Sequence, residues 1–279
     1  MDCAFATPLV LPRFKVQTGF ERKVRSMAQL PSAPSESGKS ARIALVTGGT
    51  AGIGAAISEA LQAAGFRVAA NYARNVQGAQ DFATRTGIAC FAWNVADFAA
   101  CQAGVDQVLE AMGPVEVLVN NAGITRDAML HKMRPEQWRE VLEVDLVGCF
   151  NMCRCVIDGM RTRHYGRIVN ISSVNALTGQ IGQTNYAAAK AGMLGLTRSL
   201  ALEGAAHHIT VNALAPGYTD TAMVSAVKPE VLAQVLQAVP AGRLATPAEI
   251  ARGVVFLVAE EAGFINGITL SINGGKYLG

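Results

Sequence analysis

The stretch TGGTAGIG, residues 47–54, lies between an apolar run and a helix-length segment. The glycines at Gly48, Gly52 and Gly54 have a G-x-x-x-G-x-G spacing. Glycine is needed where a turn is tight, where backbone approaches a pyrophosphate and where a helix packs closely on a strand. The free N–H groups at the start of the helix then attract phosphate. A tight turn without a ligand is the alternative, but the position between strand and helix favours nucleotide binding.

Short apolar runs separated by helix-length segments continue along the chain. Because these runs are continuous rather than alternating, they suit strands that are buried on both faces. Parallel strands joined by helices form a doubly wound sheet with right-handed crossovers. The sequence therefore predicts one Rossmann-type α/β domain over residues 41–279, with a seven-stranded parallel sheet. The predicted strands are residues 42–47, 67–72, 88–93, 115–120, 167–172, 209–214 and 268–272.

Residues 1–40 differ in composition from the rest of the chain. Their last part, LPSAPSESGKS at residues 30–40, is rich in proline, serine and glycine, and the part before it has no clean period. This composition predicts a disordered N-terminal extension. Two alternatives for it are an organelle transit peptide, because it is basic, and an upstream start codon with Met27 as the natural first residue.

Composition excludes several classes of function. Residues 1–40 hold 6 of the 24 Lys and Arg and 3 of the 21 Asp and Glu, which leaves 18 of each charge in the folded part. This balance argues against a nucleic-acid-binding face, and no run reaches the ~18 apolar residues of a membrane span.

The six cysteines form no CxxC pair, and the sequence shows no signal-peptide pattern that would direct the chain to an oxidising compartment. Both observations predict reduced thiols in the cytoplasm. Cys149 and Cys153 share a helix face, where small core side chains are commoner than ligands of a soft metal, so no metal is predicted.

The segment after the second predicted strand indicates which dinucleotide binds. NYARN, residues 71–75, has no acid to hold the ribose 2′-hydroxyl of NAD, whereas Arg74 suits a 2′-phosphate. NADP(H) is therefore the predicted cofactor, and a solvated loop arginine is the alternative. Asn94, after the third strand, would hydrogen-bond the adenine edge. NNAG, residues 120–123, would bring backbone to the adenosine and ribose side.

Three polar side chains near the fifth strand predict carbonyl chemistry. Tyr186 and Lys190 are four residues apart and so share one helix face. The lysine ammonium stabilises a phenolate, which makes Tyr186 a proton donor for a carbonyl oxygen that is being reduced. Ser173 follows the fifth strand at the carboxyl edge, where open α/β sheets place ligands, and its hydroxyl could polarise the same oxygen.

Over residues 41–279 the chain resembles the short-chain dehydrogenase/reductase family. The motifs that carry this resemblance are TGGTAGIG, NNAG, Ser173, YAAAK (residues 186–190) and PGYTDT (residues 216–221). The resemblance implies an NADP-dependent reductase in which Ser173, Tyr186 and Lys190 carry catalysis, and a homotetramer. It also implies that Lys190 contacts the nicotinamide ribose and that Thr221 meets the carboxamide. The cofactor contacts expected from it are Gly48, Thr50, Gly52, Ile53, Gly54, Arg74, Asn94, Asn121, Ala122, Gly123, Tyr186, Lys190, Pro216, Gly217 and Thr221.

Within the family, the motifs are most similar to those of reductases of 3-oxoacyl thioesters. The acetoacetyl-CoA reductases of polyhydroxyalkanoate synthesis match best, and by that match Gln180, Gln183 and Tyr218 would line the acyl pocket. The 3-oxoacyl-acyl-carrier-protein reductases of fatty acid synthesis share most of these motifs, although Gln180 and Asn175 favour the CoA enzyme. The expected activity is NADPH-dependent reduction of a 3-oxoacyl-CoA to the (R)-3-hydroxyacyl-CoA. Reduction on the carrier protein is the alternative, and a non-catalytic dinucleotide-binding scaffold is a remote one.

One position departs from the family pattern. The fourth catalytic position of the family, an asparagine, falls on Asp145 in EVDLVGCFN. By the resemblance, Asp145 is expected to hold a water that links Lys190 to solvent while adding negative charge nearby. The alternative is that Asp145 is protonated or turned toward a partner on its own helix face.

Overall fold

The computed structural model describes residues 41–221, 224 and 236–279. These belong to the compact unit that runs from Ser40 to Gly279. The predicted N-terminal extension, residues 1–40, lies outside the described residues.

All seven strands lie in one parallel sheet with the order β3-β2-β1-β4-β5-β6-β7, which confirms the predicted fold class. Each strand falls within two residues of its predicted bounds. The largest difference is at β6, which continues to Pro216 because Ala213–Pro216 pairs with β7. The strands are β1 Ile43–Val46, β2 Arg67–Tyr72, β3 Ala89–Ala92, β4 Val115–Asn120, β5 Gly166–Ile171, β6 Ile209–Pro216 and β7 Thr269–Ile272.

The continuous apolar runs are explained by burial on both faces of the sheet. In β1, Ile43 and Leu45 point into one hydrophobic core, whereas Ala44 and Val46 point into the other. All four side chains are almost fully buried. Successive strand residues face opposite sides, so a strand between two helix layers needs apolar residues at every position.

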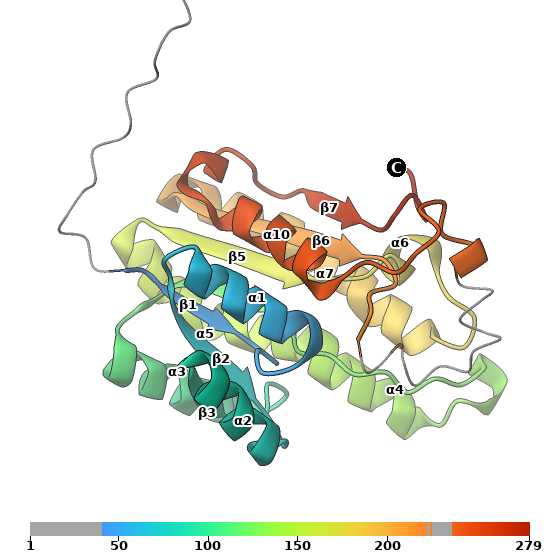
Figure 1. The fold of residues 1–279 in the computed structure, drawn as a ribbon, viewed down its shortest axis with the longest axis horizontal. Coiled ribbons are helices and arrows are strands. Elements are labelled where there is room, and N and C mark those ends of the chain that lie inside the picture. Colours follow the sequence, from blue (N-terminus) through green and yellow to red (C-terminus); the bar gives the residue numbers. More distant parts are fainter. Residues whose placement is uncertain (1–40, 222–223, 225–235) are drawn as a thin grey trace, which may run out of the picture. The chain divides into compact units, whose positions relative to one another are not determined.

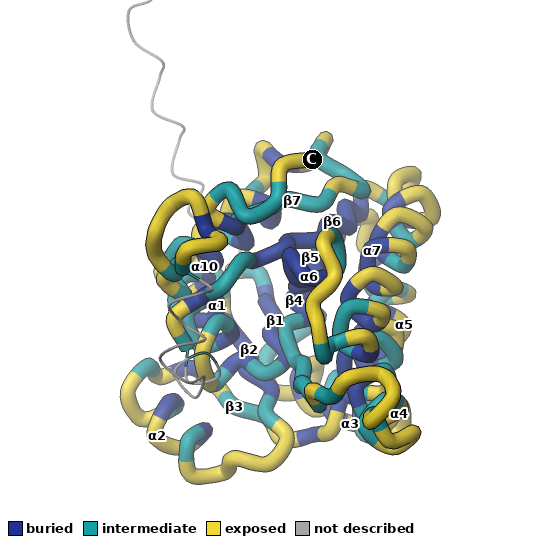
Figure 2. Tube along the Cα trace, turned by 90° about the vertical axis from the view of Figure 1, so that its right-hand side faces the viewer, coloured by how far each residue is buried: buried dark blue, intermediate teal, exposed yellow. Residues whose placement is uncertain are grey.

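Helices cover both faces of the sheet (Figure 1). Viewed toward the carboxyl ends of the strands, buried strands separate the two layers (Figure 2). One layer contains α1 Gly52–Ala63, α2 Val76–Thr86 and α10 Pro247–Val258; the other contains α3 Phe98–Met112, α5 Gly148–Arg163 and α7 Thr184–Gly204. Shorter elements are η1 Leu130–Lys132, α4 Pro135–Leu142, the π-helix η2 Glu143–Val147, α6 Asn175–Thr178, η3 Ala205–His207 and η4 Glu260–Ala262.

The strand order reverses between β1 and β4, which pair through Leu45 and Leu118. From β1 the chain builds outward to β3, and from β4 it builds outward in the other direction to β7. In open α/β sheets a ligand binds outside the carboxyl ends of the strands at such a reversal. The loops after β1, β4 and β5 therefore frame the expected site.

Across the part of the chain that the structure describes, no helix combines the length and apolar character that crossing a membrane requires.

Candidate active site

The glycine-rich loop after β1 has the backbone that its sequence predicts. Gly48 and Gly52 have φ values of +60° and +52°, a region that side chains disfavour. Gly54 is required for a different reason, because a Cβ there would lie 2.1 Å from the carbonyl oxygen of Gly48. The first turn of α1 therefore packs directly against the loop backbone.

Thr47 ties this loop to the loop after β4. Its Oγ1 accepts hydrogen bonds from the backbone N–H of Asn121, at 2.9 Å, and of Ala122, at 3.0 Å. The Asn121 side chain returns two bonds, to the carbonyl oxygens of Thr47 at 3.0 Å and of Gly48 at 3.2 Å. Sequence reasoning expected Asn121 and Ala122 to contact the cofactor and did not identify Thr47. In the sequence, the only hint of this role was that Thr47 is a polar residue directly after a buried strand.

The start of α1 fits a phosphate group. Its N-cap residue, Ala51, offers no side-chain hydrogen bond to the helix, and the first turn contains no acid. Its backbone N–H groups are thus not capped by a side chain and carry the positive end of the helix dipole. Behind them, Ser58 donates to the Gly49 carbonyl oxygen at 2.9 Å and supports the loop. Thr50 and Ile53, both expected cofactor contacts, flank the N-cap and are partly exposed.

Arg74 and Asn94 lie after β2 and β3, and both are exposed. Asn94 accepts a hydrogen bond from the Ala96 N–H at 3.2 Å through Oδ1, so its amide nitrogen is the part left for an adenine edge. No acidic residue lies between Asn71 and Asn75. The side chain of Asn75 caps α2 by accepting from Gly78 N–H at 3.0 Å. Arg74 is consequently the charged side chain of this turn.

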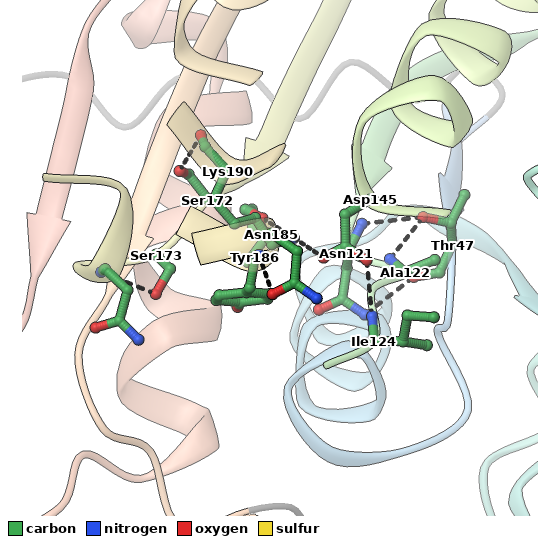
Figure 3. A network of polar contacts seen from close by, with 12 residues as sticks. Thr47, Asn121, Ala122, Ile124, Asp145, Ser172, Ser173, Asn185, Tyr186 and Lys190 are labelled. Atoms are coloured by element: carbon green, nitrogen blue, oxygen red, sulfur yellow. Dashed lines mark hydrogen bonds and ion pairs between the residues drawn. The ribbon is translucent and has the colours of Figure 1, made fainter. Parts of the chain in front are cut away.

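Tyr186 and Lys190 lie one turn apart near the start of α7, and the Lys190 ammonium is 5.5 Å from the centre of the Tyr186 ring. Ser173 follows β5, in a segment held against α7. Its neighbour Ser172 donates to the Lys190 carbonyl oxygen at 2.9 Å, and Asn175 donates to the Gln183 side chain at 2.9 Å. The structure thus fastens the segment that carries Ser173 to the helix turns that carry the other two residues (Figure 3).

A hydrogen bond orients the Ser173 hydroxyl. Its Oγ accepts from the backbone N–H of Asn175 at 3.1 Å. The hydroxyl proton is not used in that bond and is free to point toward a substrate oxygen.

Asn185 anchors the first turn of α7 and was missed by sequence reasoning. It is fully buried, and its amide donates to the carbonyl oxygens of Arg126, at 3.0 Å, and of Gln137, at 3.1 Å. Its Oδ1 accepts from the Tyr186 N–H at 2.8 Å. A polar residue beside a candidate catalytic tyrosine was the only hint in the sequence.

Asp145 lies in η2, a π-helical turn between α4 and α5, a local geometry that is frequent at functional sites. Its side chain is fully buried and faces Lys190, with 3.2 Å between Oδ2 and Nζ. Burial raises the pKa of Asp145, against the opposing effects of the Lys190 charge and the Ile124 N–H. Burial lowers the pKa of Lys190, but the contributions of Asp145, Tyr186 and Cys149 together exceed that effect, and the pKa of Lys190 is raised overall. The carboxylate thus contacts Lys190 directly and is not turned away.

Gln180, Gln183 and Tyr218, the expected acyl-pocket residues, take part in contacts between loops. Tyr218 donates to Gln180 Oε1 at 3.3 Å, and burial raises the pKa of Tyr218. Gln183 donates to Asp127 Oδ2 at 2.9 Å while its Oε1 accepts from Asn175. The orientation of the Gln183 amide is therefore set from both ends.

The loop after β6 approaches the glycine-rich loop. Pro216 ends the strand, and Gly217 is required there because a Cβ would lie 2.7 Å from the Asn273 Cα. Thr221 lies beside Gly52, since a Cβ on Gly52 would be 3.7 Å from the Thr221 methyl group. The structure thus brings the predicted carboxamide contact to the start of α1.

Within the described residues, no group of three or more His, Cys, Asp or Glu has the arrangement of a metal site. Cys149 and Cys153 are buried in the core between α5 and the sheet, and the Cys149 thiol donates to Asn170 Oδ1 at 3.3 Å. They occupy the small-side-chain positions that the sequence predicts.

Comparison with known proteins gives similarity along most of the chain. The model of the short chain dehydrogenase family matches residues 42–231. The acetoacetyl-CoA reductase of Shinella zoogloeoides is 57% identical over 237 residues, which cover 85% of this chain and 98% of that protein. The corresponding enzyme of Paracoccus denitrificans is 58% identical over 239 residues, 85% of this chain and 99% of its own. A 3-oxoacyl-acyl-carrier-protein reductase of Vibrio cholerae is 43% identical over 240 residues, 85% of this chain and 98% of its own.

Proposed function

The chain belongs to the short-chain dehydrogenase family, and from this premise we propose that it reduces a short 3-oxoacyl-CoA, acetoacetyl-CoA above all, to the (R)-3-hydroxyacyl-CoA with NADPH. The observation that carries this proposal is the assembly of Ser173, Tyr186 and Lys190 at the carboxyl edge of the sheet. The choice of a CoA thioester is supported by the acetoacetyl-CoA reductases at 57% and 58% identity, against 43% for the carrier-protein enzyme.

The three side chains have complementary tasks at the keto oxygen. When bound, NADPH supplies the hydride. Ser173 donates its hydroxyl proton in a hydrogen bond to the keto oxygen, while its oxygen accepts the Asn175 N–H and is oriented by it. Tyr186 transfers its proton to the same oxygen. Lys190 carries the positive charge beside the resulting phenolate, 5.5 Å from the ring centre.

The preference for NADP(H) is proposed from Arg74. A guanidinium after β2 forms charge-assisted hydrogen bonds with a 2′-phosphate, and the turn offers no acid that would hold a free ribose hydroxyl. The phosphate-binding loop and the uncapped start of α1 would hold the pyrophosphate, because both present backbone N–H groups without a competing acid.

We further propose a homotetramer in the cytoplasm. A hollow of about 370 Å³ on α5 and α7 is lined by Phe150, Ile157, Leu196 and Leu200, and Phe150 is 50% exposed. An exposed apolar face of this kind favours association between copies. The five described cysteines are free thiols, which is typical of a reducing compartment.

A paired substrate assay tests the function. Purified protein is given NADPH with acetoacetyl-CoA or with acetoacetyl-carrier protein, and NADPH absorbance is followed. We expect a higher kcat/KM with the CoA thioester and no turnover in Tyr186→Phe. A strong preference for the carrier substrate would move the assignment to fatty acid synthesis. NADPH binding without turnover on either substrate would instead indicate a non-catalytic scaffold.

A further inference from the structure

The buried contact between Asp145 and Lys190 is held from several sides. Asp145 Oδ1 accepts from the Ile124 N–H at 2.8 Å, and Lys190 Nζ donates to the Ile171 carbonyl oxygen at 3.1 Å. Gly123 packs closely against the pair, because a Cβ there would lie 2.7 Å from Asp145 Oδ2 and 3.2 Å from Nζ. The carboxylate cannot rotate away from the ammonium without breaking the Ile124 bond.

The charges around this pair are few. Apart from Asp145, the groups that act electrostatically on Lys190 are Tyr186 on α7 and Cys149 on α5. Cys149 is a neutral thiol, because its hydrogen bond with Cys153 and its burial raise its pKa well above its usual range. Among these groups, the carboxyl group of Asp145 is therefore the acid that faces Lys190, 3.2 Å from Nζ.

Resting on the proposed reduction, we propose that Asp145 is a positioning residue that extends the reduction to higher pH by opposing the ionisation of Tyr186. During reduction the Oη–H bond of Tyr186 breaks as its proton moves to the substrate oxygen, while hydride from NADPH forms the new C–H bond. Only the protonated tyrosine supports this direction. The reverse oxidation of the 3-hydroxyl group needs the phenolate as base.

The carboxylate is close enough to matter. Oδ2 lies 3.2 Å from Nζ, and Nζ lies 5.5 Å from the Tyr186 ring centre. Oδ2 is therefore no farther than about 9 Å from that centre. A unit charge at this distance, in an effective dielectric constant of about 20, shifts a proton equilibrium by about one pH unit. The ammonium favours the phenolate, and the carboxylate cancels part of that effect.

The test is Asp145→Asn, which removes the charge and keeps the shape and the acceptor for Ile124. The pH–rate profiles are measured for reduction of acetoacetyl-CoA with NADPH and for oxidation of (R)-3-hydroxybutyryl-CoA with NADP⁺. We expect the alkaline limb of reduction and the acid limb of oxidation to move together to lower pH, by about one unit. Glu143→Gln is the matched control, because Glu143 is an exposed acid in the same π-helical turn and should move neither limb.

A second measurement does not depend on turnover. The ultraviolet absorbance of phenolate is titrated in the NADPH-bound protein, and the signal of Tyr186→Phe in the same background is subtracted. Asp145→Asn should ionise this tyrosine at lower pH by the same amount. Asp145→Ser repeats the test if the first variant melts early.

Each result bears on one claim. Superimposable profiles, or a shift to higher pH, would overturn the role of Asp145, and so would a shift of one limb alone. Turnover lost at every pH, with NADPH binding intact, would also overturn it and would mean that the carboxylate itself relays protons. If the unaltered protein does not reduce acetoacetyl-CoA, the proposed function fails, and the absorbance titration still decides the effect of Asp145 on Tyr186.

Discussion

Removing the Thr47 hydroxyl should loosen the contact between the two loops that form the nucleotide end of the proposed site. In Thr47→Val the side chain keeps its shape, but the backbone N–H groups of Asn121 and Ala122 lose their acceptor. Those bonds are 2.9 Å and 3.0 Å long, and Thr47 is only 1% exposed. Leaving a donor unsatisfied costs about 1 to 3 kcal/mol when it is buried. Because both donors are only partly buried, we expect about 2 to 3 kcal/mol for the pair.

This loss corresponds to a melting temperature lower by about 4 to 12 °C for a domain of this size. The matched control is Thr47→Ser, which keeps Oγ and loses one methyl group, at about 1 kcal/mol. Thermal unfolding followed by circular dichroism measures the stability, and quenching of protein fluorescence measures NADPH affinity. Thr47→Val should also bind NADPH about tenfold more weakly, because the backbone of Asn121 and Ala122 loses the acceptor that positions it beside the glycine-rich loop. If Thr47→Val melts within about 2 °C of Thr47→Ser and binds NADPH equally well, the bonds do not hold the loops together.

Three further changes test other parts of the chain. Arg74→Ala should raise the KM for NADPH about tenfold or more and leave that for NADH nearly unchanged in steady-state assays, because it removes charge-assisted bonds to a 2′-phosphate; equal losses with both cofactors would assign Arg74 to folding. Gly54→Ala should abolish tight NADPH binding in fluorescence titrations, since its Cβ would lie 2.1 Å from the Gly48 carbonyl oxygen, and an unchanged affinity would contradict this. The Arg243 side chain and the Thr246 N–H lower the pKa of Glu249 to about 2. That stabilisation is present above the unfolded value of about 4.3 and is lost as pH falls toward 2, so the melting deficit of Glu249→Gln should be largest at neutral pH and shrink below about pH 4; a pH-independent deficit would refute the assignment.

Part of the site follows from the sequence because it depends on local chemistry. Gly48 and Gly52 adopt positive φ values that glycine tolerates best. Tyr186 and Lys190 share a helix face because of their spacing of four. Both features depend on neighbouring residues in the chain and not on contacts with distant residues.

Other features depend on atoms that are far apart in the chain. Asn185 looked like an ordinary helix residue, yet it anchors α7 to the carbonyl oxygens of Arg126 and Gln137. Asp145 was expected to add negative charge near Lys190, and the structure gives the distance between the two side chains, 3.2 Å from Oδ2 to Nζ. Contacts such as these require two segments to meet within a fraction of an ångström, and no local pattern encodes that distance.

The sequence alone thus determined the parallel sheet, the conformation of the glycine-rich turn and the candidate catalytic side chains, because backbone preference and the period of apolar residues act over a few neighbouring residues. Only the tertiary structure decided that the Thr47 hydroxyl joins β1 to β4 and that the acid at Asp145 forms a buried ion pair with Lys190. The physical reason is that the energy of a hydrogen bond or an ion pair depends on the separation, orientation and burial of its two groups, and packing of the whole domain sets all three.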